Sequence, residues 1–258
     1  MNETGTPQAP NAFLLALEGR APWEFGATLA SFPLMRLAPR GDGHAVVVFP
    51  GLAASDFSTL PLRAFLRERG YRPYGWDLRF NFGPRAGVLA QSIERVREVR
   101  RTSGRKVSLI GWSLGGIYAR EIAKLMPDDV RCVITLASPF AGHPRANNAW
   151  RVYEFASGHA VDDPEQLARV REVPPVPTTS VFSRSDGIVA WQCCLQESGA
   201  LCESVEITAS HVGMGVNPAA WYVLADRLAQ EPGRWQPFHR EGWRRWLYRD
   251  PYRAGDRD

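Results

Sequence analysis

One serine of this chain lies in a pattern that could make it a nucleophile. Ser113 is the centre of a G-x-S-x-G sequence that runs from Gly111 to Gly115. An apolar, strand-like run at residues 106–110 precedes it, and apolar residues at helical spacing follow it. A serine on such a tight turn projects from the end of a sheet, and a side chain at either glycine would clash with nearby backbone. The pattern predicts a nucleophilic Ser113, with a purely structural strand-to-helix turn as the alternative.

The strand, turn and helix around Ser113 resemble the α/β-hydrolase superfamily, in which an acid and then a histidine follow the serine along the chain. Asp186 follows a β-branched run at residues 176–183 and precedes Gly187, which would allow the chain to turn. We therefore predict Asp186 as the acid, with an ordinary β-turn as the alternative. The competing acids fit the order less well, because they end the helix after the serine (Asp128, Asp129) or lie in the next insertion (Asp162, Asp163).

Two histidines follow Asp186 in the sequence. His211 comes directly after a strand-like run at residues 204–208, whereas His239 lies in a basic, aromatic tail. A lone histidine is more often structural than catalytic, but its order and its position after a strand favour His211 as the base.

The resemblance also implies an oxyanion hole, which is a pair of backbone N–H groups that stabilise developing negative charge. An apolar strand runs into Pro50 and Gly51, where the family commonly has a His-Gly pair. Proline in place of histidine costs little, because the hole consists of backbone amides. We assign it to the amides of Leu52 and Leu114, with a plain Pro-Gly turn as the alternative.

These residues need a sheet whose strands end at one edge. Strands are expected at residues 44–49, 72–76, 106–110, 130–136, 176–182 and 204–208. Helices are expected at 13–37, 60–68, 88–102 and 218–229, and apolar residues at helical spacing over 117–126 indicate another. The alternation predicts one α/β domain over residues 1–258, with a doubly wound, mostly parallel sheet. Residues 1–12 are expected to be disordered. The hairpin with which this fold usually begins is not evident in the first forty residues.

Residues 141–175 interrupt the alternation and are predicted to form a short cap over the site, with an ordinary crossover as the alternative. The residues expected to contact an apolar acyl group are Trp112, Phe140, Trp150, Tyr153, Trp191, Val212 and Met214. The tail at residues 234–258 mixes aromatic and basic residues. It is expected to pack on the domain, and peripheral membrane contact is the alternative.

Composition excludes several other classes of protein. The chain has 258 residues, 45% of them hydrophobic, and a net charge of +4, with no nucleic-acid-binding motif. It has no run of eighteen apolar residues and no signal peptide, so a cytoplasmic location is expected. The four cysteines have no zinc-site spacing and are expected to be reduced, although a Cys194–Cys202 bridge is the alternative.

The resemblance implies a serine hydrolase of the lipase or esterase kind, acting on small-molecule or lipid-like carboxylic esters without a metal or organic cofactor. A thioesterase or an acyltransferase with the same residues is a first alternative. A catalytically silent hydrolase fold used for binding is a second. The sequence indicates neither the substrate nor the oligomeric state.

Overall fold

The computed structural model describes residues 7–142, 146–148, 150, 154 and 164–252. Within those residues, six strands form one sheet in the order β2-β1-β3-β4-β5-β6, and every neighbouring pair is parallel. The strands are β1 (Ala45–Phe49), β2 (Arg72–Gly75), β3 (Val107–Trp112), β4 (Val130–Leu136), β5 (Thr178–Phe182) and β6 (Cys202–Glu206).

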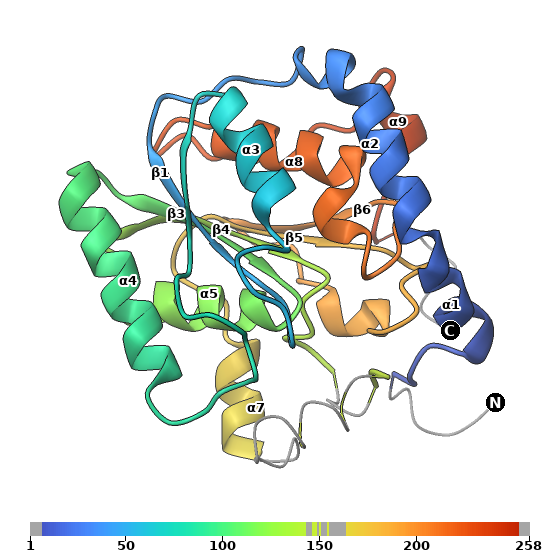
Figure 1. Ribbon diagram of the computed structural model, residues 1–258, viewed down its shortest axis with the longest axis horizontal. Coiled ribbons are helices and arrows are strands. Elements are labelled where there is room, and N and C mark those ends of the chain that lie inside the picture. The colour runs from blue at the N-terminus through green and yellow to red at the C-terminus, as the bar shows by residue number, and fades with distance from the viewer. Residues whose placement is uncertain (1–6, 143–145, 149, 151–153, 155–163, 253–258) are drawn as a thin grey trace.

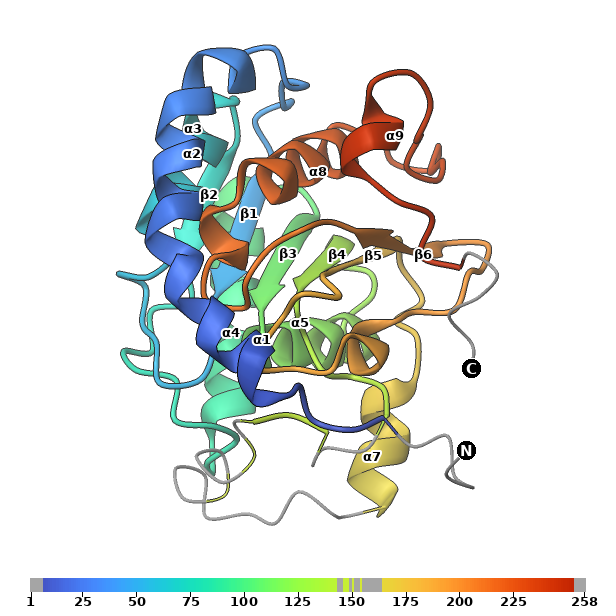
Figure 2. The same ribbon diagram turned by 90° about the vertical axis from the view of Figure 1, so that its right-hand side faces the viewer.

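Helices cover both faces of the sheet (Figure 1). The α-helices are α1 (Ala12–Ala16), α2 (Ala21–Met35), α3 (Leu60–Glu68), α4 (Val88–Ser103), α5 (Leu114–Leu125), α7 (Pro164–Arg171), α8 (Pro218–Leu228) and α9 (Arg244–Leu247). Three 3₁₀ turns accompany them within the described residues, namely η1 (Leu17–Arg20), η2 (Trp191–Cys194) and η3 (Met214–Val216). Helices α2, α3 and α8 lie on one side of the sheet and α4 and α5 on the other (Figures 1 and 2). The predicted doubly wound parallel α/β sheet is confirmed.

Successive side chains of a strand point to opposite faces of the sheet and pack into two separate hydrophobic cores. In β1, Val46 and Val48 join the core under α3 and α8, whereas Val47 and Phe49 join the core under α4 and α5. All five residues of β1 are buried, as expected for a parallel strand covered on both faces.

The strand order has a topological switch point between β1 and β3. The chain builds β1, adds β2 on one side of it, and then places β3 on the other side. The connections that leave β1 and β3 therefore diverge to opposite faces, and ligands of such sheets bind where this happens, at the carboxyl ends of the strands. Ser113 follows β3 at this point.

The strand expected at residues 204–208 begins and ends two residues earlier in the structure, where it is β6. Cys202 to Glu206 pair with Thr178 to Phe182 of β5. Two buried glutamates lie within this strand, and each has an arginine partner: Glu203 pairs with Arg227 and Glu206 with Arg184. These long-range ion pairs allow charged residues inside a buried strand, which the local sequence pattern argues against.

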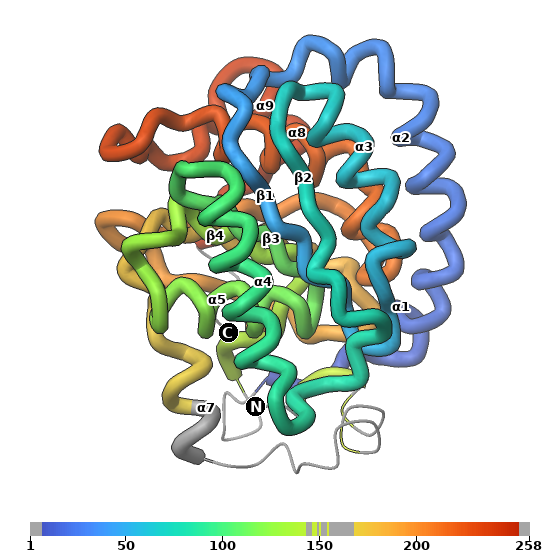
Figure 3. The backbone as a smooth tube through the Cα atoms, turned by 60° about the vertical axis from the view of Figure 1, so that its left-hand side comes forward, coloured from blue at the N-terminus to red at the C-terminus, as the bar shows by residue number. Residues whose placement is uncertain are grey.

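The N-terminal arm, which we define as residues 12–35, is helical. Helix α1, turn η1 and α2 follow one another, and α2 packs against α8 and η3 along the outside of the domain (Figure 3). Glu24 is the only ionisable residue in α2 and is turned inward, whereas Trp23 and Leu34 are 79% and 65% exposed. Residue 12 begins α1, and residues 1–6 lie outside the described residues.

Part of the predicted cap, residues 143–145, 149, 151–153 and 155–163, lies outside the described residues, including Tyr153 and the acids Asp162 and Asp163. Helix α7 falls within this segment. In the tail, Phe238 and Tyr248 are buried in the core, whereas Trp246 is 75% exposed.

All four cysteines are free thiols within the protein, so Cys194 and Cys202 are not bridged. Among the described residues, no helix combines the length and apolarity needed to cross a bilayer.

A buried histidine lies at the opposite edge of the sheet, just before β1. His44 Nδ1 is 2.5 Å from Asp42 Oδ1 and its Nε2 is 2.8 Å from Ser108 Oγ. Arg131 and Arg105 also contact Asp42. Burial lowers the pKa of His44 from 6.5 to about 4, against the opposing effect of Asp42.

We expect His44 to make the protein less stable in mild acid. Between pH 6.5 and 4 the unfolded chain binds a proton at this residue that the native state does not. The free energy of unfolding should therefore fall by about 3 kcal/mol as the pH drops through this window. Urea unfolding of the wild type and His44→Gln at pH 7, 6, 5 and 4.5 measures it. The variant should be less stable at pH 7 and have a flatter profile. Equal slopes for the two proteins would contradict the assignment.

Candidate active site

Ser113 lies on a strained turn between β3 and α5. Its φ of 52° and ψ of −122° fall in a region that non-glycine residues rarely occupy. A Cβ at Gly111 would overlap the backbone of Gly115 and Gly116, and a Cβ at Gly115 would overlap the Phe49 carbonyl. The predicted clash at both glycines is confirmed, and their absence of side chains lets α5 start directly against the sheet.

Three side chains from separate loops meet at this turn. The Nε2 atom of His211 is 3.0 Å from Ser113 Oγ, and its Nδ1 atom is 2.7 Å from Asp186 Oδ2. The other carboxylate oxygen, Oδ1, accepts hydrogen bonds from the backbone N–H groups of Ile188 and Val189, each at 2.8 Å. Asp186 is therefore fixed in orientation, and it holds the imidazole with a proton on Nδ1 and a lone pair on Nε2 facing the serine.

The electrostatics of His211 differ from those of His44. Burial alone lowers the pKa of His211, but the charge and hydrogen bond of Asp186 and the charge of Glu18 raise it, so the pKa lies above its usual value. Both Asp186 and His211 are buried, at 3% and 7% exposure. Such a histidine retains a proton well once it has accepted one, which suits a group that takes a proton from a hydroxyl.

The competing residues are placed elsewhere. The side chain of His239 is 65% exposed and lies 3.6 Å from Glu241. Asp128 is exposed at the end of α5, and the neighbouring Asp129 pairs with Arg100.

The loop after β1 faces the Ser113 turn. Gly51 adjoins the serine, since a Cβ built on it would lie 3.4 Å from Ser113 Cβ. The backbone N–H groups of Leu52 and Leu114 donate no hydrogen bond to any residue that the structure describes. Two unpaired N–H groups beside a nucleophile can stabilise an oxyanion.

Asn81 holds this loop in place and was not identifiable from the sequence. Its buried side chain donates a 2.9 Å hydrogen bond to the Pro50 carbonyl. Its backbone carbonyl accepts from Ala53, at 2.7 Å, and its backbone N–H donates to Ala54, at 2.8 Å. Ala53 has a φ of 55°, so these bonds keep the loop in a conformation that is otherwise unfavourable.

The residues predicted to contact an acyl group are distributed unevenly. Trp112 packs beside the histidine, and its Nε1–H donates to the His211 carbonyl at 3.2 Å. Val212 is 47% exposed next to the histidine, whereas Met214 is fully buried in the core.

Two other residues predicted to contact the acyl group have aromatic rings that make cation–π contacts with arginines. Phe140 lies under the guanidinium of the buried Arg120, 3.8 Å away, and Trp191 lies under that of Arg184, 3.7 Å away. Trp150 is half-buried in the described part of the insertion.

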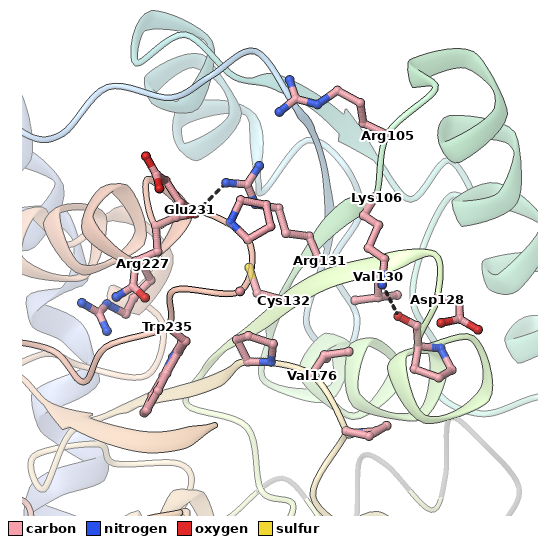
Figure 4. Close-up of a pocket in the computed structure, with 16 residues that line it drawn as sticks. Arg105, Lys106, Asp128, Val130, Arg131, Cys132, Val176, Arg227, Glu231 and Trp235 are labelled. Atoms are coloured by element: carbon pink, nitrogen blue, oxygen red, sulfur yellow. Dashed lines mark hydrogen bonds between the residues drawn. The ribbon is translucent and has the colours of Figure 1, made fainter. Parts of the chain in front are cut away.

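A hollow of about 520 Å³ lies at the other edge of the sheet, by the amino ends of β3 and β4 (Figure 4). Its lining includes three arginines, each of which already has a partner within the fold. Arg105 and Arg131 contact Asp42, and Arg227 contacts Glu203. The hollow therefore presents no unpaired guanidinium to a ligand, and it is remote from Ser113.

The N-terminal arm supplies contacts that the sequence pattern did not reveal. Glu18 and Glu24 accept hydrogen bonds from the loop that carries His211. One signal was present in the sequence, because Glu24 is an isolated charge within the otherwise uncharged residues 21–35. Such a residue is expected to face a polar partner.

Comparison with known proteins gives a consistent picture. The alpha/beta hydrolase family matches residues 46–255. A pimeloyl-[acyl-carrier protein] methyl ester esterase of Shewanella woodyi is 30% identical over 110 residues, which are 43% of this chain and 42% of that protein. The chain thus matches less than half the length of this relative.

Solved structures share the fold at low sequence identity. Lipase B of Aspergillus fumigatus superposes with a TM-score of 0.58 and 16% identity, covering 75% of this chain and 55% of that one. Lipase BlEst2 of Bacillus licheniformis, in its mature form, gives a TM-score of 0.55 and 16% identity, covering 74% of this chain and 94% of that one.

Proposed function

The chain belongs to the alpha/beta hydrolase family, and from that premise we propose that it is a serine hydrolase that cleaves carboxylic esters of apolar acyl groups. The observation that carries the proposal is the line of hydrogen bonds from Asp186 through His211 to Ser113. The Shewanella woodyi relative supports the choice of an ester bond, since that protein is a methyl ester esterase.

The proposed reaction proceeds through an acyl-enzyme. Ser113 Oγ attacks the ester carbonyl while His211 Nε2 takes its proton. The protonated imidazole, stabilised by Asp186, then gives the proton to the departing alcohol. Water repeats the sequence on the acyl-enzyme and releases the acid and the free serine.

Negative charge that develops on the carbonyl oxygen needs stabilisation in each half of the reaction. The N–H groups of Leu52 and Leu114 provide it in this proposal, held by Asn81 on one side and by the start of α5 on the other. The N-terminus of α5 adds a favourable dipole at the same place.

Neighbouring activities use the same residues. A thioester could replace the ester, and an alcohol could replace water as acceptor, which would make the protein a thioesterase or an acyltransferase. A silent fold used for binding is disfavoured by the hydrogen-bonded Ser113, His211 and Asp186.

A fluorophosphonate probe and a panel of acyl esters test the proposal. The native protein should be labelled at Ser113 and should hydrolyse acetyl, butyryl, octanoyl and palmitoyl esters of p-nitrophenol, with kcat/KM rising from the acetyl to a longer ester. Each added methylene that an apolar pocket contacts changes kcat/KM by roughly 10- to 200-fold. Absence of labelling and of turnover under native conditions would leave the binding protein as the better reading, and faster turnover of acyl thioesters would favour the thioesterase.

A further inference from the structure

We propose that Glu18 of the N-terminal arm is a positioning residue for this reaction, because its carboxylate ties the loop of Asp186 to the loop of His211. The proposal rests on the proposed function, which assigns the acid and the base to those two loops.

One carboxylate group joins three backbone N–H groups from the two loops. Glu18 Oε1 accepts from Gly187, at 2.7 Å, and from His211 itself, at 2.9 Å. Its Oε2 accepts from Val212, at 2.9 Å. Without Glu18, the N–H groups of Gly187, His211 and Val212, next to both the acid and the base, would lose this partner.

A second set of arm contacts reaches earlier residues of the same two loops. Glu24 accepts from the backbone N–H of Ser210, at 2.7 Å, and from its hydroxyl, at 3.0 Å. Arg20 donates to the Ser185 carbonyl, at 3.0 Å, and to its hydroxyl, at 2.7 Å. Arg20 and Glu24 are themselves 2.9 Å apart. The arm therefore contacts the residues immediately before the acid and before the base.

Each of the two loops has a glycine where the N-terminal arm packs closely against it. A Cβ at Gly187, just after the acid, would overlap the Leu14 carbonyl of α1. A Cβ at Gly213, two residues after the base, would overlap the Glu24 carboxylate. Neither glycine has a positive φ, so each is required for space and not for backbone conformation. The chain bends at Gly187 as expected, and the glycine is needed there for space.

Charge gives Glu18 a distinctive effect on the base. The charged groups that face His211 are Asp186 on the acid loop and Glu18, Glu24 and Arg20 on the arm, the last two paired with each other. Both Asp186 and Glu18 raise the pKa of His211. The neutral imidazole is the active form, so kcat/KM should rise with pH through a midpoint above 6.5, the ordinary value.

The experiment compares Glu18→Gln and Glu18→Ala with the wild type as full-length proteins. Glutamine retains an oxygen that can accept from Gly187 and His211 but loses the charge. In Glu18→Gln the acid-side midpoint of kcat/KM should therefore move to lower pH. In Glu18→Ala the loops lose the contacts that adjoin the acid and the base, and kcat should fall by about ten- to a hundredfold while KM changes by less than about threefold. Rates are expressed per site that a fluorophosphonate labels.

Two control variants separate this role from general effects. Trp23→Ala alters the exposed outer face of the same arm, and Glu94→Gln removes an exposed negative charge from α4. Both should keep the wild-type kcat and midpoint. A residue that only stabilised the fold would lower the melting temperature of its variants without moving the midpoint per labelled site.

The titration of the His211 ring, followed by NMR in a Ser113→Ala background, provides a readout that needs no turnover. A lower pKa of His211 in Glu18→Gln supports the proposal even if Glu18→Ala does not fold. An unchanged His211 pKa together with wild-type kcat per labelled site would overturn it. A wild type that is neither labelled nor active would instead refute the proposed function, and the NMR comparison would still decide whether Glu18 acts on His211.

Discussion

Ser113→Ala should hydrolyse p-nitrophenyl butyrate at least about 10⁵-fold more slowly in kcat than the wild type, because the nucleophile is lost and the remaining groups act only as a unit. The fold should be unaffected, since the Ser113 hydroxyl lies at the surface of the turn and its hydrogen bond, 3.0 Å long, is to the side chain of His211. The strained backbone tolerates alanine as it tolerates serine. Steady-state kinetics measure the loss, and far-UV circular dichroism with thermal unfolding checks the structure.

Ser108→Ala, in the strand β3 that precedes Ser113, is a matched control. Ser108 also lies beside a histidine that contacts an aspartate, with its Oγ 2.8 Å from His44 Nε2, but it is completely buried. This variant should retain activity and fluorophosphonate labelling. Retained activity in Ser113→Ala, or loss of it in Ser108→Ala without unfolding, would refute the assignment of the nucleophile.

Asp186→Asn should lower kcat by about 10⁴-fold, the size of the effect of the corresponding change in chymotrypsin-type serine proteases. The geometry explains why. Asp186 Oδ1 accepts from the N–H groups of Ile188 and Val189, so asparagine would place its carbonyl oxygen there. Its NH₂ group would then face His211 Nδ1, and the imidazole would have to carry its proton on Nε2. A protonated Nε2 cannot accept the proton of Ser113.

The measurement is kcat and KM for the same ester at a pH above the midpoint of the wild-type profile. Asp128→Asn removes a carboxylate that is exposed at the end of α5 and should leave both constants unchanged. A loss of less than about threefold in Asp186→Asn would indicate that another acid orients His211.

Local patterns in the sequence were sufficient to predict the sheet and the three residues that meet at its edge. The run of apolar residues in β1 and the two glycines around Ser113 each report a constraint that acts within a few residues. Chain order then selected Asp186 and His211, and their positions after β5 and β6 follow from the parallel sheet.

The contacts of the arm could not be predicted in the same way. Glu18 and His211 are 193 positions apart, and no periodicity links them. The same limitation explains β6, in which ion pairs with distant arginines allow two buried glutamates. The role of Asn81 could not be predicted either, because Asn81 follows β2 and the loop that it holds follows β1.

The separation between Glu18 and its partners also determines when this protein becomes competent during its synthesis. The arm is made first, whereas the loop of His211 is made 193 residues later. At about 5–20 residues per second, a ribosome needs roughly 10 to 40 s to cover that distance. Throughout this time the apolar helix α2 has neither α8 nor η3 to cover it. A nascent chain that stalls just before residue 211 already contains all six strands and Ser113 but lacks its base, so the contact between Glu18 and His211 can form only after every strand of the sheet has been made.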